Sequence, residues 1–329
     1  MNRLAFHRRR ATPAALLALA LSGLSAAGAQ GQEAHPAQAS VPAPSQWALS
    51  PQWWQSSDSD GLSIKKPGAT AYYRWESGAT WHGVEVQQQR YTQAGATLEG
   101  RSLAAVGQSV DPATWLGYGY RVAWSDGPER ATWTGDGFWS GALGPRTQWG
   151  VFGTRDRVDS FKGLQAGLTF DLVGASLDHQ LAPGLALTGA ASATRFSDEQ
   201  DRRQLRLRAV WDALPEQGIT LQLHLKGQQG ERDVAVRRYF NPGRLEEGQL
   251  VLGWRKRWEG WQLSARAGQG VQRVDRGDST PMRTAEAQIQ SPLRGNQFFR
   301  LRFGWSETQG LDGPGYTYRS GDLSWVFRL

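Results

Sequence analysis

The sequence predicts an all-β fold, a transmembrane antiparallel β-barrel of roughly 16 strands. Three observations lead to this prediction. Apolar and polar residues alternate through most of the chain, its 329 residues include 40 glycines and 16 tryptophans, and its mean hydropathy is low at −0.53. After the N-terminal region, no apolar run reaches the ~18 residues that a membrane helix needs. A barrel accounts for this pattern because only every second residue of its strands faces lipid.

The N-terminal region has the organisation of a secretory signal peptide. Arg3 and the run from Arg8 to Arg10 are basic, an apolar stretch follows, and Ala27-Gly28-Ala29 forms a small-x-small cleavage pattern. We therefore predict a signal peptide over residues 1–29, cleaved near Ala29. Residues 30–44, rich in Gln, Ala and Pro, are predicted to be a flexible leader, and residues 45–329 the barrel. A buried N-terminal helix is the alternative, and basic residues without acidic neighbours disfavour it.

Charge and cysteine content narrow the class of protein further. The whole chain carries a formal net charge of +7, but the predicted signal peptide removes four arginines and leaves 33 basic against 30 acidic residues. A nearly balanced mature chain has no global field for nucleic acid, so no nucleic-acid partner is expected. The absence of cysteine excludes disulfides, thiol catalysis and cysteine metal sites.

Period-two alternation marks the predicted strands. In residues 219–226, Ile and Leu alternate with Thr, Gln, His and Lys, and similar patterns occupy residues 204–211, 261–267, 299–305 and 322–329. Turn signals such as Pro183-Gly184 separate these segments, and longer loops, for example 275–281, are expected at the other end. Helical signals are nearly missing. The polar run at 198–201 is predicted to be a solvated loop.

Aromatic residues near the segment ends favour a barrel over a soluble β-sandwich or propeller. A sandwich gives no reason for aromatic residues at strand ends, whereas a membrane barrel carries aromatic girdles at both interfaces. The residues interpreted as girdle members are Trp53, Trp54, Trp75, Trp124, Trp211, Trp258 and Trp305.

The last predicted strand carries a further signal. Residues 322–329 resemble the C-terminal signature read by the bacterial barrel-assembly machinery, with matches at Asp322, Phe327 and Leu329. Ser324 stands where glycine is usual, and Leu329 stands where phenylalanine is commonest. This resemblance implies the bacterial outer membrane as the location. It also implies the assembly machinery, outer-membrane lipid and lipopolysaccharide as partners.

The sequence nominates no catalytic residue, metal site or cofactor. Two of the five histidines lie before residue 36, and His82, His179 and His224 lack zinc-ligand spacing. Some outer-membrane barrels are lipases that use a Ser–His pair, so a lipid-modifying enzyme stays open as a lesser alternative. Interfacial or loop histidines are the simpler interpretation.

The polar faces of the strands supply the candidate functional residues. If the apolar faces meet lipid, the residues predicted to line the pore are Arg206, Arg208, Lys226, Arg266, Arg300 and Arg302. The residues Gln222, His224, Glu286, Gln288 and Gln290 accompany them. Cationic rings favour anions, and Arg and Gln suit the hydroxyls and carboxylates of a sugar chain. An equally weighted interpretation is that these residues only fill and hydrate the barrel and pair with acidic neighbours.

One motif departs from simple alternation. Tyr239-Phe240-Asn241-Pro242, followed by a strand with Leu250, Leu252 and Trp254, resembles the C-terminal porin domains of exopolysaccharide secretion proteins of the cellulose and poly-N-acetylglucosamine type. The similarity is clear over about the last hundred residues and otherwise rests on layout. It implies a conduit that exports an anionic or neutral exopolysaccharide, with no catalytic residues.

The resemblance also has a departure. Those exporters carry a helical repeat scaffold before the barrel, whereas here only residues 30–44 would precede it. An exporter of this kind would therefore need a separate periplasmic scaffold protein. The alternative function is a non-conducting receptor or structural barrel that binds a phage or a surface partner.

Overall fold

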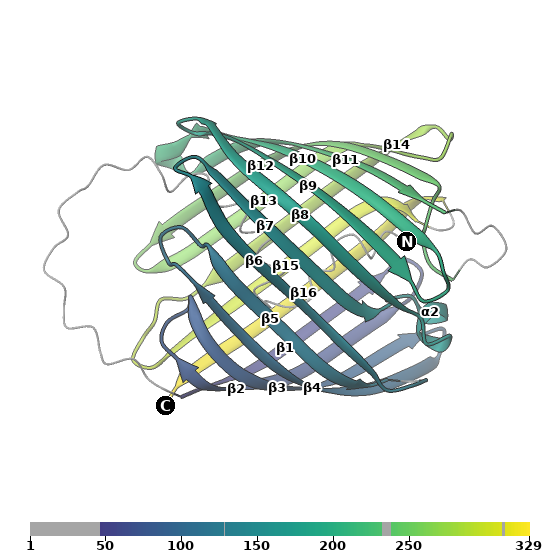
Figure 1. Cartoon of the computed structure of the whole chain (residues 1–329), viewed down its shortest axis with the longest axis horizontal. Helices are drawn as coiled ribbons and strands as arrows, with labels where there is room; N and C mark the ends of the chain where they lie inside the picture. Colours follow the sequence, from purple (N-terminus) through teal and green to yellow (C-terminus); the bar gives the residue numbers. More distant parts are fainter. Residues whose placement is uncertain (1–46, 128, 232–237, 311–312) are drawn as a thin grey trace, which may run out of the picture.

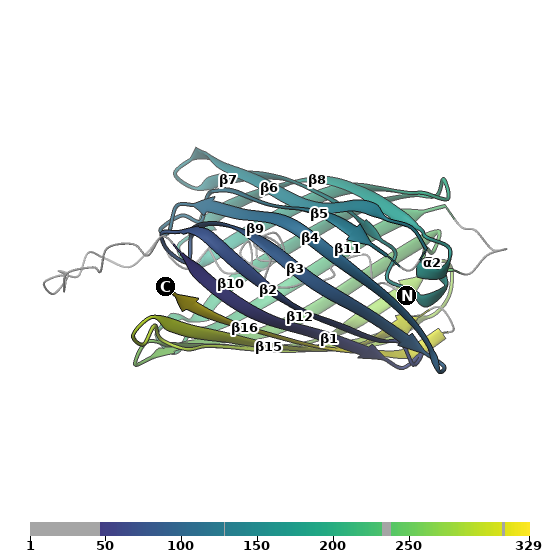
Figure 2. The ribbon, with the colours of Figure 1, turned by 90° about the horizontal axis from the view of Figure 1, so that it is seen from below.

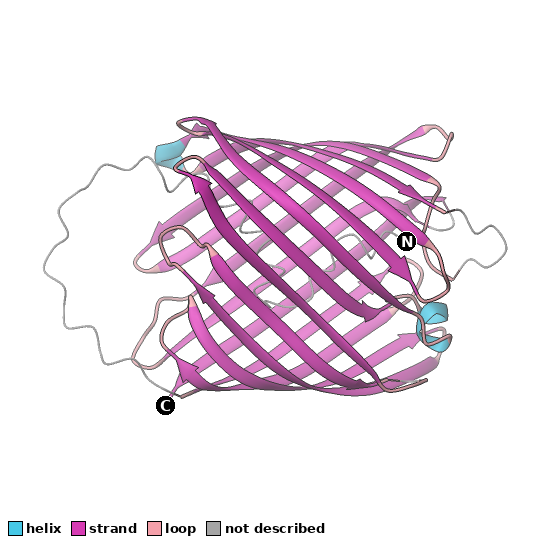
Figure 3. Ribbon diagram, viewed as in Figure 1, coloured by secondary structure: helices cyan, strands magenta, loops and turns pink. Residues whose placement is uncertain are grey.

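The computed structural model describes residues 47–127, 129–231, 238–310 and 313–329, without the side chains of residues 313 and 314. The predicted signal peptide and leader lie outside these residues. Strands make up nearly all of the described chain (Figure 3). No helix in the described residues is long and apolar enough to span a membrane.

Sixteen antiparallel strands close into one barrel (Figure 1). Each strand pairs with its neighbours in sequence, and β1 pairs with β16 to complete the ring. The prediction of a closed all-β barrel of about 16 strands is therefore confirmed. The strands are β1 (Ala48–Asp58), β2 (Ser63–Trp75), β3 (Thr80–Gln93), β4 (Ala96–Val110), β5 (Gly117–Asp126), β6 (Thr132–Gly144), β7 (Thr147–Arg157), β8 (Thr169–Ala182), β9 (Leu185–Phe196), β10 (Asp201–Leu214), β11 (Ile219–Gly230), β12 (Arg244–Trp258), β13 (Trp261–Val274), β14 (Ser279–Gln290), β15 (Gln297–Gly310) and β16 (Gly313–Arg328).

Alternation along the strands separates an apolar outer face from a mostly polar inner face. On β10 and β11, Leu205, Leu207 and Leu223 are 54%, 41% and 42% exposed, while Gln204 and Gln222 between them are buried. Large exposed apolar side chains on every strand are costly in water and favourable against hydrocarbon. The outer face is therefore the lipid-facing surface.

The two ends of the barrel differ in their connections. The end that holds both Ala48 and Arg328 has short turns such as 145–146, 183–184 and 259–260. The opposite end carries the long connections 158–168 and 231–243. In bacterial outer-membrane barrels, the short turns lie on the periplasmic side and the longer loops on the extracellular side. We therefore assign the end that holds Ala48 and Arg328 to the periplasm. A predicted long loop at 275–281 is wrong, because β13 continues to Val274 and β14 begins at Ser279.

Two periplasmic turns show how local chemistry fixes the connections. Between β10 and β11, a 3-10 turn η2 (Pro215–Gln217) ends at Gly218, whose φ is 72°. A Cβ there would lie 1.8 Å from the carbonyl oxygen of Arg255, so only glycine fits. Between β4 and β5, Asp111 accepts hydrogen bonds from Ala113 and Thr114, and these bonds hold the pKa of its exposed carboxyl below the usual value.

A short helix, which the sequence reading missed, lies at the extracellular end. Helix α2 (Phe161–Gln165) begins at Ser160, whose hydroxyl accepts the hydrogen bond of the Gly163 N–H. Figures 1 and 2 both show α2 at the end opposite the C-terminus. The available signal was the N-capping serine followed by two apolar residues three positions apart.

The predicted aromatic girdles are partly wrong. Trp54 and Trp75 point into the barrel and are only 3% and 6% exposed, because each occupies the inward phase of its strand. Trp53, Trp124, Trp211 and Trp258 are exposed on the outer face, while Trp305 is half-buried.

Candidate functional site: the barrel interior

The six basic residues predicted to line the pore all occupy inward positions on β10, β11, β13 and β15. Arg206 lies opposite Lys226, and Arg208 lies opposite His224. Arg302 lies opposite Gln288 on one side and Asp322 on the other. We call the inner surface of β10–β16 the polar wall.

Carboxylates accompany these cations. The Lys226 ammonium lies 2.9 Å from Glu247, and the Arg266 guanidinium lies 2.6 Å from Glu286. Arg300 instead donates two hydrogen bonds to the amide oxygen of Gln290, at 3.1 and 3.0 Å. The described interior is therefore of mixed charge, and Asp322 adds a carboxylate beside Arg302.

A cavity of about 380 Å³ occupies the periplasmic half of the interior. Its polar lining includes Arg266, Arg300, Arg302 and the amides of Gln288 and Gln290, whereas Arg206, Arg208 and Lys226 do not line it. Of the six predicted residues, three thus meet in this space. The other three lie on a separate part of the same wall.

Aromatic residues from β2, β3 and β15 line the same cavity beside these polar residues. Tyr72, Trp75, Trp81 and Phe298, which we call the aromatic crescent, contact one another with ring centroids 4.8 to 6.5 Å apart. Val326 packs in the same cluster. The crescent was not predicted from the sequence, because the inward faces of the strands were expected to be polar. The signal was Val326, the apolar residue that interrupts the polar face of the last strand.

The extracellular mouth is narrowed by two inward-folded connections. We call residues 158–168 and 238–243 the cap. Phe161 and Leu164 of α2 pack on Trp54, Ile64 and Tyr91, which belong to β1, β2 and β3. Because α2 follows β7, this connection crosses the mouth past β6, β5 and β4 to reach β1–β3. Its contacts are apolar and almost fully buried.

The second part of the cap contains the family-like motif. The ring of Tyr239 stacks on Phe196 at 4.5 Å and its hydroxyl donates to Asp198 at 2.8 Å. Phe240 packs with Leu245 and Tyr316.

Arg202 holds this second part to the wall. It donates to the Phe240 carbonyl oxygen at 2.7 Å and to the Asn241 side chain at 2.9 Å. Ser160 donates to the Arg238 carbonyl oxygen at 2.6 Å, which joins the two parts of the cap, and Pro242 is buried beside them. The four motif residues therefore anchor a loop.

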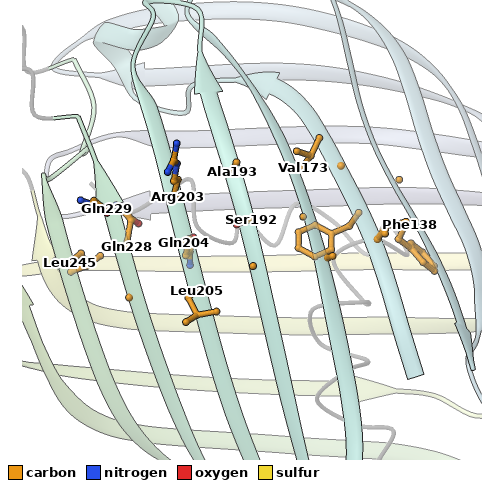
Figure 4. A pocket seen from close by; sticks show the side chains of 18 of the residues that line it. Phe138, Val173, Ser192, Ala193, Arg203, Gln204, Leu205, Gln228, Gln229 and Leu245 are labelled. Carbon is orange, nitrogen blue, oxygen red and sulfur yellow. The ribbon is translucent and has the colours of Figure 1, made fainter. Parts of the chain in front are cut away.

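A larger cavity of about 1180 Å³ borders the wall formed by β6–β12 (Figure 4). Its lining alternates between inward residues such as Gln204 and Gln228 and outward residues such as Val173 and Leu205. This volume therefore does not measure the width of the interior. One of its residues is notable, because neither amide atom of the buried Gln228 has a hydrogen-bond partner among the described residues.

The histidines bond to groups other than metal ligands. His82 pairs with the Tyr120 hydroxyl at 3.2 Å, and His179 pairs with the Thr147 hydroxyl at 2.9 Å. His224 bonds Gln222 at 3.0 Å in the polar wall. Within the described part of the chain, no three His, Asp or Glu side chains gather where they could hold a metal ion.

Comparison with known proteins places the fold. No protein-family model and no curated protein matches the chain. Among solved structures, a bacterial polysaccharide outer membrane secretin matches with a TM-score of 0.62 and 11% identity, covering 87% of this chain and 99% of that one. OpdL of Pseudomonas aeruginosa matches with a TM-score of 0.45 and 11% identity, over 86% and 98% of the two chains. OccAB3 of Acinetobacter baumannii matches at 0.41 and 8%, over 85% and 98%.

At such low identities these matches concern the fold alone. The apolar outer face, the closed antiparallel ring and the fold comparison define the chain as an outer-membrane β-barrel.

Proposed function

We propose that this barrel is a conduit for exopolysaccharide, anionic or neutral, across the outer membrane. The observation that carries the proposal is the lining of the periplasmic cavity, where arginine and glutamine side chains lie beside the aromatic crescent. A pyranose ring has the same two characters. Its hydroxyls suit amide and guanidinium groups, and its C–H faces suit aromatic rings.

Unsatisfied amides in the interior also support a hydroxyl-rich ligand. Gln228 and Gln272 are 3% and 2% exposed, and neither Gln228 amide atom nor the Gln272 nitrogen has a partner among the described residues. Buried polar groups normally find a partner in protein, water or ligand. A glycan would reach these amides only after neighbouring side chains move, because both residues are almost fully buried.

The arginines bear on the charge of the polymer. Arg300 donates its hydrogen bonds to a neutral glutamine amide, and the carboxylate of Asp322 lies near both Arg300 and Arg302, so two cations share one acidic neighbour in the cavity. The ion pairs at Lys226 and Arg266 reduce the field elsewhere. This balance favours neutral or moderately anionic chains over strongly cationic ones.

The proposal includes the partners that such a conduit needs. The fold match to a polysaccharide secretin supports a polymer as cargo. Delivery from the periplasm would fall to a separate scaffold protein, and insertion into the membrane to the barrel-assembly machinery. Transport would require the cap to move, because its apolar contacts narrow the outer mouth.

The cap also favours a second candidate function. A barrel whose mouth is closed by packed aromatic residues would serve as a receptor or structural protein that binds a phage or surface partner through its extracellular connections. The two functions differ in whether polymer release depends on the protein. They also differ in whether the barrel conducts ions.

The test combines planar-bilayer conductance with deletion of the gene in the source bacterium. We expect an anion-preferring conductance and loss of surface polysaccharide on deletion. Replacing both Arg300 and Arg302 with Gln should lower the anion preference by about twofold, since two of the six predicted cations are removed. The matched control is Arg203→Gln with Arg283→Gln on the outer face. Normal polymer secretion without the protein, together with a silent bilayer, would contradict the conduit and favour the receptor.

A further inference from the structure

The outer face carries a groove at the extracellular end of β2, β3 and β4. The groove has a volume of about 440 Å³ and is lined by Ser63, Lys65, Arg90, Thr92, Thr97 and Glu99. All six residues lie on the lipid-facing side, so neither the interior nor the proposed conduit uses them.

Strand register arranges these residues in two rows. Ser63, Thr92 and Thr97 lie side by side and form a row of hydroxyls nearest the extracellular rim. Lys65, Arg90 and Glu99 form the next row toward the membrane. Hydroxyls and cations in adjacent rows offer both hydrogen-bond donors and positive charge to an anion.

The charged row contains an unfavourable pair. Lys65 lies directly opposite Arg90 in the antiparallel ladder, and like charges in that position destabilise a sheet. Glu99 lies 2.7 Å from Arg90 and compensates that cation. The Lys65 ammonium makes no ion pair with any described residue. An external anion between Lys65 and Arg90 would relieve the repulsion.

The position of the groove along the membrane normal shows which part of the lipid such an anion would belong to. Two further steps along the strands, the outward row becomes apolar, with Ala69, Val86 and Leu103 paired across β2, β3 and β4. Val86 and Leu103 are 53% and 55% exposed and mark the hydrocarbon. Arg101 lies between the two levels, opposite Gln88. The charged row therefore stands at the head-group level of the outer leaflet.

The periplasmic boundary of the outer face differs in chemistry. There the exposed large side chains include Tyr73, Tyr118, Trp211, Trp254 and Trp258. Aromatic residues suit a phospholipid interface, whereas paired cations and hydroxyls suit phosphate groups. Exposed aromatic residues also lie at the extracellular boundary, at Trp124 and Trp133, so the feature that distinguishes the groove is the cations paired with hydroxyls.

We infer that the groove between Lys65 and Arg90 binds a phosphate group of the lipid A part of lipopolysaccharide. Lys65 and Arg90 supply the charge, the row of hydroxyls supplies further hydrogen bonds, and Arg101 adds a cation on the membrane side. Glu99 opposes the phosphate and sets an upper limit on its affinity.

The experiment measures lipid bound to the refolded, detergent-solubilised barrel by native mass spectrometry. The probes are bisphosphorylated lipid A, fully dephosphorylated lipid A, phosphatidylglycerol and inorganic phosphate. The test variant is Lys65→Gln with Arg90→Gln, and the matched control is Arg146→Gln with Lys256→Gln, two exposed cations of the periplasmic end. Glu99→Gln is a third variant with the opposite expected sign. Heat-shift on a gel without lipid verifies that each variant is folded.

We expect the test variant to bind bisphosphorylated lipid A at least about tenfold more weakly, because each cation contributes to the attraction of an anionic head group. The control variant should bind like the unmodified barrel, and Glu99→Gln should bind more tightly. Equal binding by the test and unmodified barrels would overturn the inference, as would equal binding of dephosphorylated lipid A. Inorganic phosphate or phosphatidylglycerol bound as tightly as lipid A would overturn the assignment to this glycolipid. Because the experiment measures only bound lipid, its result does not depend on whether the barrel conducts ions or exports polymer.

Discussion

The two ends of the barrel use aromatic residues in opposite ways. At the extracellular end, Phe161 and Tyr239 pack against wall residues and hold the cap in the mouth. At the periplasmic end, Trp75 and Trp81 pack together in the lining of a cavity that also contains arginines. The rings at both ends are buried, and the difference lies in what they join: the cap rings join a connecting segment to the wall, whereas the periplasmic rings join neighbouring strands. Inside this barrel, one aromatic cluster holds the cap in the extracellular mouth, and another lines the periplasmic cavity.

The outer surface shows the same division between the ends. Hydroxyls and cations line a groove at the extracellular rim, and exposed tryptophans such as Trp211 and Trp258 lie at the periplasmic boundary. The two ends therefore carry different arrangements of side chains both inside and outside the barrel. Variants that remove the features of one end should leave the other end unchanged.

The largest expected effect comes from opening the cap. Replacing Phe161 and Leu164 with Ala removes two buried anchors, each worth about 2–4 kcal/mol of packing. The closed state should lose more than a hundredfold in relative population, since about 1.4 kcal/mol corresponds to tenfold. Single-channel conductance should rise, with longer open times.

The control for this prediction is Leu103→Ala with Leu205→Ala on the lipid face, where no cap contact is lost. Unchanged conductance in a cap variant whose loop has become accessible to protease would show that the cap does not limit passage.

A buried ion pair should give the next largest effect, this time on stability. Arg121 and Glu85 bond at 3.0 Å with side chains only 9% and 3% exposed. Glu85→Gln leaves a buried guanidinium without its carboxylate, which costs about 3–5 kcal/mol. The unfolding midpoint in guanidinium chloride should fall.

The comparison variant is Asp171→Asn, which breaks the exposed pair with Arg155 near the extracellular rim. Exposed pairs contribute about 0–1 kcal/mol, so the midpoint should barely move. If the unfolding midpoint fell equally in the two variants, burial inside the barrel would not make the Arg121–Glu85 pair more stabilising than the exposed Arg155–Asp171 pair.

The smallest effect concerns one hydrogen bond in the cap. Tyr239→Phe keeps the ring on Phe196 but removes the bond to Asp198, worth about 1 kcal/mol. Because the chain has no cysteine, Leu164→Cys gives a single thiol that is buried while the cap is closed. In that background, Tyr239→Phe should speed thiol labelling about fivefold. No change in rate would mean that this bond does not hold the closed cap.

Much of the fold could be predicted from sequence because strand phase is a local property. Leu205, Leu207 and Leu223 alternate with polar residues, and a two-residue period allows only one face to meet lipid. The inward positions of the six basic residues follow from the same rule. Whether those residues line a conducting path stays a prediction.

The sequence by itself determined the barrel class, the lipid-facing strand phase and the inward direction of the arginines. Only the tertiary structure decided the cap, the aromatic crescent and the Lys65–Arg90 groove. Each of these features joins residues from elements whose relative register the sequence does not specify, such as Phe161 with Tyr91, or Trp75 with Phe298. The reason is physical: alternation fixes which way a side chain points, but barrel closure and loop folding fix which side chains it meets.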